Sequence, residues 1–274
     1  MTDLQTATRT PVGALLRSWR QRRGLSQLDL ACEADISTRH VSFLETGRSL
    51  PSRAMLIHLS ERLDIPLRER NTLLVAAGFA PVYGERRLED PALPAARRAV
   101  DQVLAGHEPY PALAVDRHWT LVAANRAVAP LLAGAAADLL APPVNVLRLS
   151  LHPAGLAARI ENLQQWREHV LLRLSRQIAA SGDPVLRRLL EELGSLPPPG
   201  DAGPPAASVE HPEVAIPLRL RTDGGVLSLI STTTVFGTAV DVTLSELAVE
   251  AFFPADAATG DALRRALPPP PVKA

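Results

Sequence analysis

The segment "DISTRHVSFLETGRSLPS", residues 35–52, decides the fold of the N-terminal region. Its apolar residues Val41 and Leu44 are three positions apart, which places both on one face of a helix. Ser37 stands before this run as a helix N-cap, and Gly47 follows it as a stop signal. The segment therefore predicts a short amphipathic helix with a polar outer face.

Similar helix start and stop signals occur on both sides of this segment. Five short helices are expected between Pro11 and Gly78, with Ser26 and Ser52 as further N-caps and Asp29 completing a capping box with Ser26. Only "ADIS", residues 34–37, separates the second helix from the third. Such a tight link crosses two helices steeply, as in a helix-turn-helix, whose second helix enters the major groove of DNA.

Charge is distributed unevenly along the chain. The 274 residues have a formal net charge of zero, with 29 basic and 29 acidic side chains. Between Arg9 and Arg53, however, eight basic residues face four acidic ones. An N-terminal domain with this excess of positive charge is suited to bind the phosphates of nucleic acid.

The stretch "RGLSQLDLACEADISTRHVSFLETGRSLPS", residues 23–52, resembles the XRE, or phage-repressor, type of helix-turn-helix. The resemblance implies that Thr38, Arg39 and Phe43 face bases, with Arg39 suited to guanine. It also implies an ion pair between Arg20 and Glu45 that holds the fold. The complete set of expected DNA-contacting residues is Gln27, Ser37, Thr38, Arg39, His40, Ser42, Phe43 and Arg48.

Several side chains of this domain keep two interpretations. Phe43 is either a base contact or a core residue, and Arg17, Arg22 and Arg23 bind phosphates or form a solvated face. Cys32, the single cysteine, is expected to be a small buried residue of the second helix.

Residues 79–94 are expected to be a linker, residues 95–258 a second domain, and residues 259–274 a Pro-rich tail. Strand patterns at 112–116 and 120–125 predict a hairpin, with Asn125 capping a following helix. Amphipathic helices are expected at 95–105, 154–180 and 183–196, a second hairpin at 214–236, and a last strand at 247–256. Five strands with helices between the second and third indicate an α+β, PAS-like domain with an antiparallel sheet.

The order of these segments resembles the ligand-binding domain of MmyB-like transcription regulators. The resemblance rests on "RERNTLLVAAGFAPVY", "PALAVDRHWTLVAAN", "NVLRLSLHP", "LRTDGGVLSLISTTTVFGT" and "ELAVEAFFPAD" in that order, and covers residues 11 to 259. It implies a sequence-specific DNA-binding regulator whose second domain senses a hydrophobic small molecule, a fatty acid or related lipid.

A fatty acid needs an apolar pocket and a polar anchor for its carboxylate. Arg148 and His152 are four residues apart, so one helix face would present both to an anion; the other interpretation is an ordinary ion pair or a satisfied histidine. Trp119, Trp166, Phe236 and Phe252 are candidates for the pocket wall or, alternatively, for plain core.

Enzymatic functions fit the sequence poorly. A Ser-Lys self-cleaving repressor needs an ordered lysine, and the one lysine is Lys273 in "PPPPVKA"; the "HEPYP" at His107 lacks the second histidine of a zinc peptidase. We expect no metal site, and no cofactor beyond a bound fatty acid. With one cysteine and no long apolar run, a cytoplasmic protein without a membrane partner is expected.

The expected assembly is a homodimer on a double-stranded DNA operator. The alternative function is a DNA-binding regulator whose second domain serves only dimerisation or protein docking and holds no ligand.

Overall fold

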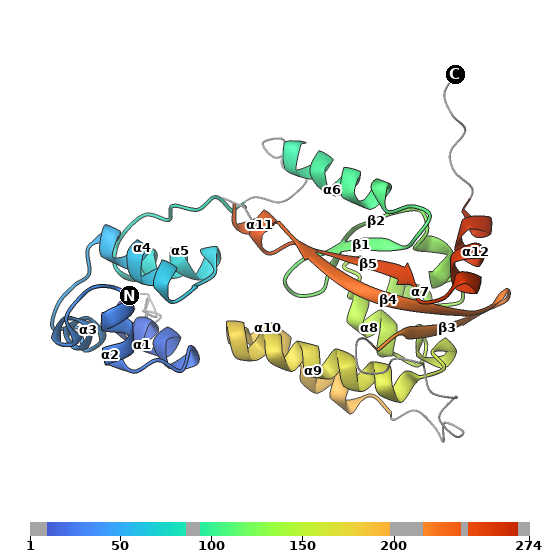
Figure 1. Ribbon diagram of the computed structural model, residues 1–274. Helices are drawn as coiled ribbons and strands as arrows, with labels where there is room; N and C mark the ends of the chain where they lie inside the picture. Colours follow the sequence, from blue (N-terminus) through green and yellow to red (C-terminus); the bar gives the residue numbers. More distant parts are fainter. Residues whose placement is uncertain (1–9, 86–93, 198–215, 237–240, 268–274) are drawn as a thin grey trace, which may run out of the picture. The chain divides into compact units, whose positions relative to one another are not determined.

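The computed structural model describes residues 10–85, 94–197, 216–236 and 241–267, which fold into two compact units (Figure 1). The first unit holds the described residues up to Glu85, together with Asp241 and Val242. The second holds the remaining described residues. The parts of the predicted linker at 86–93, the loop at 198–208 and the tail at 268–274 lie outside the described residues.

The first unit is all-helical, as predicted. Its helices are α1 Val12–Arg22, α2 Gln27–Glu33, α3 Thr38–Glu45, α4 Arg53–Arg62 and α5 Leu67–Ala76. The predicted caps are confirmed, because the side chains of Ser26, Ser37 and Ser52 each accept a hydrogen bond from a backbone N–H three residues on. In return, the Asp29 carboxylate accepts a hydrogen bond from the Ser26 backbone N–H, which completes the capping box.

A glycine allows α1 to approach α3 closely. A Cβ atom at Gly13 would lie 2.4 Å from the carbonyl oxygen of Leu44 and 2.7 Å from that of Glu45. No side chain fits such a gap, so Gly13 is required for the two helices to pack as they do. Leu16 and Trp19 of α1 are buried in the same core as Val41 and Leu44 of α3.

The second unit contains a five-stranded antiparallel sheet with helices, which confirms the predicted α+β class. The strands are β1 Ala112–Val115, β2 Leu121–Ala124, β3 Leu218–Thr222, β4 Gly225–Val235 and β5 Ala248–Pro254, in the order β2-β1-β5-β4-β3. Between β2 and β3 lie η1 Ala129–Leu132, α7 Ala137–Leu140, α8 Val146–Leu151, η2 Ala157–Arg159, α9 Leu163–Ser181 and α10 Pro184–Ser195. The others are α6 Pro94–Gly106, α11 Val242–Ser245 and α12 Ala257–Ala266.

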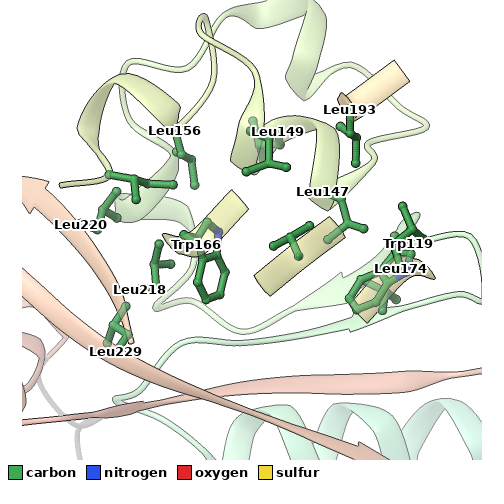
Figure 2. Packing of buried hydrophobic residues seen from close by; sticks show 14 of the residues in the cluster. Trp119, Leu147, Leu149, Leu156, Trp166, Leu174, Leu193, Leu218, Leu220 and Leu229 are labelled. Carbon is green, nitrogen blue, oxygen red and sulfur yellow. The ribbon is translucent and has the colours of Figure 1, made fainter. Parts of the chain in front are cut away.

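Each face of the sheet packs against different helices. Val100 and Leu104 of α6 pack on one face with the side chains of Val249 and Ala251. The other face packs against α8, α9 and α10, where Trp166 and many leucines form the largest core (Figures 1 and 2). Because successive residues of β5 point to opposite faces, Glu250 and Phe252 face the α8–α10 side.

Asn125 does not cap a helix, contrary to the prediction. It is 7% exposed, and its side chain accepts from the Ala112 N–H and donates to the carbonyls of Leu104 and Tyr110. These three backbone groups lie at the end of α6 and the start of β1. The buried Asn125 amide therefore pairs with backbone polar groups of the turn between α6 and β1. Only the short 3-10 helix η1 follows Asn125.

Two predicted boundaries are wrong. The long helix begins at Leu163 rather than at 154, although Leu156 and Ile160 are still buried in the core that its apolar face covers. Residues 259–266, predicted to be tail, belong to α12, whose Leu263 is 4% exposed and joins the same core.

Candidate functional sites

The predicted recognition helix α3 presents a polar face beside a buried apolar one. Ser37, Thr38, Arg39 and Arg48 are exposed, while His40, Ser42 and Phe43 are half-buried. Val41 and Leu44 are 2% and 1% exposed and fix the helix to the core. The structure therefore brings seven of the eight expected DNA-contacting residues together on α3 and its two ends.

Two arginine side chains lie over the ring of Phe43. The guanidinium carbon of Arg39 lies 5.1 Å from the centroid of the Phe43 ring, and that of Arg48 lies 5.8 Å from it. Cation–π contacts at exposed sites such as these contribute about 0.5–1 kcal/mol. Phe43 is half-buried and lies within cation–π distance of both arginines, a contact that the sequence interpretation did not predict.

The predicted ion pair between Arg20 and Glu45 is present. The Arg20 Nε donates to Glu45 Oε1 over 2.6 Å and its Nη2 donates to Oε2 over 3.0 Å. Burial by itself raises the pKa of Glu45, but hydrogen bonds from Arg20 and Gln27 and the positive charge of Arg20 outweigh it, so the pKa is lowered. Gln27, expected near a phosphate, donates to Glu45 Oε2 over 2.8 Å.

Two further expectations for this domain change. Arg23 donates to the carbonyls of Leu63 and Asp64, so its guanidinium ties the end of α1 to the end of α4. Arg22 lies over the Trp19 ring, 4.9 Å from the centroid. Cys32, expected to be buried, is exposed.

The second unit contains an apolar cavity between the sheet and helices α8 and α9, with about 100 Å³ of accessible space. Fourteen residues line it: Leu113, Trp119, Val146, Leu147, Ser150, Leu156, Trp166, His169, Val170, Arg173, Leu218, Ser231, Glu250 and Phe252. Figure 2 shows Trp119, Trp166 and Leu147 among the buried leucines of this region. A mainly apolar wall with a few polar side chains is typical of binding sites for small organic molecules.

Three of the six expected ligand-binding residues line this cavity, namely Trp119, Trp166 and Phe252. Phe236 packs instead against the core on the α6 face of the sheet. Arg148 and His152 do not share a helix face, because α8 ends at Leu151 and His152 has extended backbone angles. Arg148 pairs with Glu192 of α10, which matches the alternative interpretation as an ordinary ion pair.

The polar residues of the cavity come from four elements. His169 and Arg173 lie on α9, Ser150 on α8, and Ser231 and Glu250 on strands β4 and β5. Sequence interpretation missed all five, because no local pattern links positions so far apart. Glu250 gave the one available signal, since it is a charged residue inside the apolar strand "LAVEAFF".

Comparison with known proteins agrees with this division into two units. Residues 96–266 match the family described as MmyB-like transcription regulator ligand binding domain, and residues 16–70 match a family described as Helix-turn-helix. The chain belongs to the MmyB-like transcription regulators. The two matched regions of this MmyB-like regulator are thus a helix-turn-helix and the ligand-binding domain of its family.

One curated relative of this MmyB-like regulator is the HTH-type transcriptional regulator PrpR of Mycobacterium tuberculosis (strain ATCC 25618 / H37Rv). The two are 43% identical over 61 residues, which is 22% of this chain and 13% of the relative. A solved structure described as an RNA-binding Light-Oxygen-Voltage receptor aligns over 94% of this chain and 62% of its own, with 16% identity and a TM-score of 0.25. A likeness at that score does not establish a common fold.

Within the described ranges, no helix has the length and apolar character needed to span a bilayer. In the same part of the chain, no group of three or more histidine, cysteine or acidic side chains is arranged to hold a metal ion.

Proposed function

We propose that this MmyB-like regulator reads a specific DNA operator through α3 and that a hydrophobic small molecule, a fatty acid or related lipid, occupies the cavity of its second unit. The observation that carries the ligand part is the cavity itself. Two tryptophans, Phe252 and several leucines and valines form most of its wall. Burial of an alkyl chain there stabilises the complex by about 0.8 kcal/mol for each CH₂ group removed from water.

The DNA part is supported by the polar face of α3. Thr38 and Arg39 occupy its N-terminal turn, the end that a helix-turn-helix directs toward base edges. Arg39 is suited to donate two hydrogen bonds to guanine. Arg48 and Ser37, both exposed, are suited to phosphate contacts. In this proposal a homodimer places two copies of α3 in successive major grooves, about 34 Å apart.

Ligand control follows if the ligand has different affinities for two arrangements of the protein. A ligand that binds both arrangements with equal affinity does not shift the equilibrium between them. The response is therefore set by the difference between the two affinities. In the proposed function, occupation of the cavity changes the relation between the two recognition helices of the dimer and hence the affinity for the operator.

Organic extraction of the purified protein followed by mass spectrometry tests the ligand part. A hydrophobic molecule close to one equivalent per chain is expected. The variant Ser231→Phe, which fills the cavity from β4, should reduce that amount, whereas Thr232→Phe places the same ring on the opposite face of the strand and should not. Repeated absence of any such molecule from protein made in a lipid-replete host would favour a second domain that only dimerises or docks.

A further inference from the structure

The charged groups in the wall of the cavity are Arg173 of α9 and Glu250 of β5, and each neutralises the other. Arg173 Nη2 donates to Glu250 Oε1 over 2.6 Å, and Nη1 donates to Oε2 over 2.9 Å. The Glu250 side chain is only 5% exposed. Thr233 Oγ1 donates to Glu250 Oε1 over 2.8 Å, so the carboxylate has three hydrogen-bond donors around it.

The guanidinium of Arg173 is also fixed on its other side. Its central carbon lies 4.5 Å from the centroid of the Trp119 ring, and its Nη2 donates to Thr233 Oγ1 over 2.5 Å. A two-pronged arginine–carboxylate pair with these additional contacts is a rigid arrangement. Its net charge is zero, so the positive charge of Arg173 does not act alone on a ligand.

The remaining polar side chains of the cavity wall are His169, Ser150 and Ser231. The His169 ring stacks on Trp166, with 5.5 Å between centroids. Burial lowers the pKa of His169 and the charge of Arg173 lowers it further, while the charge of Glu250 opposes them; the net effect favours the neutral imidazole. The Ser150 hydroxyl accepts a hydrogen bond from the Trp166 indole over 2.9 Å and keeps its own proton to donate.

These groups form hydrogen bonds but supply no net positive charge. A carboxylate placed among them would put a second negative charge near Glu250, in an apolar site where an uncompensated charge is costly. An alcohol, amide or ester needs only a donor or an acceptor, and a neutral imidazole and two hydroxyls offer both.

We propose that the cavity selects a lipid with an uncharged, hydrogen-bonding head group over the ionised fatty acid of the same chain length. The inference deepens the proposed function and rests on it, because it assumes that an alkyl chain occupies the cavity. It concerns the head group alone and follows from the Arg173–Glu250 pair and its neutral neighbours.

Calorimetric titration of the full-length, delipidated protein with 1-dodecanol and with dodecanoate at pH 8 tests the inference. At that pH the free acid is ionised, so the two probes differ in head-group charge. The dissociation constant of 1-dodecanol should be lower by about tenfold or more. Equal or tighter binding of dodecanoate would overturn the inference while leaving the lipid-binding proposal in place, and failure of both probes to bind would refute both.

The variant Glu250→Gln sharpens the test. It removes the carboxylate but keeps a side chain that hydrogen-bonds to Thr233, so the charge of Arg173 becomes available to an anion. Dodecanoate binding should tighten by about tenfold, while 1-dodecanol binding changes by less than about threefold. Unchanged dodecanoate affinity in a folded Glu250→Gln protein would contradict the inference.

Glu161→Gln is the matched control. Glu161 accepts a hydrogen bond from Arg219 over 3.0 Å and does not line the cavity. Its loss removes an ion-paired carboxylate from the same unit without altering the charge of the wall, so the preference between the two probes should not change. If Glu250→Gln does not fold, the ratio of the wild-type affinities for 1-dodecanol and dodecanoate alone decides whether the inference holds.

Discussion

Arg20 of α1 donates two hydrogen bonds to Glu45, the last residue of α3, with the shorter one at 2.6 Å. The two side chains are 9% and 3% exposed, and Gln27 at the start of α2 binds the same carboxylate. One buried carboxylate therefore joins three helices. The predicted DNA-reading helix is held at its C-terminal end by this contact, while its N-terminal end carries the predicted base-reading residues.

Replacing Glu45 with Gln should destabilise the first unit at neutral pH by about 3 kcal/mol, because Arg20 would then be buried without its partner charge. The pKa of Glu45 is lowered from its ordinary value of 4.5. A carboxyl group of this kind stabilises the fold above its unfolded pKa, and the contribution is lost as the pH falls through the folded pKa. The difference between wild type and Glu45→Gln, measured by denaturant unfolding, should therefore shrink below about pH 4.5. A difference that stayed constant down to pH 3 would contradict this assignment.

Arg39→Ala should weaken binding to the selected operator by about 1–3 kcal/mol and relax the preference at one base pair. Arg22→Ala is the comparison: if Arg22 contacts a phosphate, as one of its two interpretations has it, its loss weakens binding to all sequences alike and flattens the salt dependence. Competition binding against a set of single-base operator variants measures both effects. Operator discrimination that survives in Arg39→Ala would show that Arg39 does not read a base.

Phe43→Ala should resemble Arg39→Ala in its effect on operator preference, since it removes the ring that orients Arg39 and Arg48. Phe43→Tyr keeps an aromatic face for both guanidinium groups and should retain most of the affinity. Both variants are measured in the same competition assay. A Phe43→Ala protein with wild-type preference would mean that the arginines are oriented by DNA alone.

Gly13→Ala should destabilise the first unit by about 2 kcal/mol or more, because the added methyl group would overlap the Leu44 carbonyl oxygen. Hydrogen exchange followed by mass spectrometry should show lost protection in peptides from α1 and α3. Gly194→Ala in α10 is the control, since a Cβ there meets nothing within 4 Å. That substitution should stabilise its helix by about 0.5 kcal/mol.

Asn125→Ala should cost the second unit about 3 kcal/mol, because the Ala112 N–H and the Tyr110 carbonyl would lose the amide as partner and the Leu104 carbonyl would keep only the His107 N–H. Denaturant unfolding of the full chain measures this, with Gln164→Ala on the exposed face of α9 as a control expected to change stability by less than about 0.5 kcal/mol. Equal stability of the two variants would show that water replaces the amide.

Much of the first unit could be predicted because its signals are local. A serine cap, an apolar pair three or four residues later and a closing glycine all act within one helix. Gly13 could not be interpreted in this way, since the reason for a glycine lies in α3, some thirty residues along the chain. Phe43 was ambiguous for a similar reason: its function depends on how Arg39 and Arg48 lie over it.

The cavity was less predictable because it is assembled from residues distant in sequence. Trp119, Trp166 and Phe252 could be proposed from residue type alone, but nothing local distinguishes them from Phe236, which packs on the other face of the sheet. The proposed anchor of Arg148 and His152 failed because α8 is only six residues long. The Arg173–Glu250 pair joins a helix to a strand 77 residues away, and no spacing rule reaches so far.

The affinity of the full-length protein for its selected operator, measured by fluorescence anisotropy with and without saturating 1-dodecanol, tests the central claim most directly. We predict that the ligand changes this affinity by about fivefold or more, and that Ser231→Phe removes the response while Thr232→Phe retains it. Operator affinity that is the same with and without 1-dodecanol, in a protein shown by calorimetry to bind it, would contradict the account.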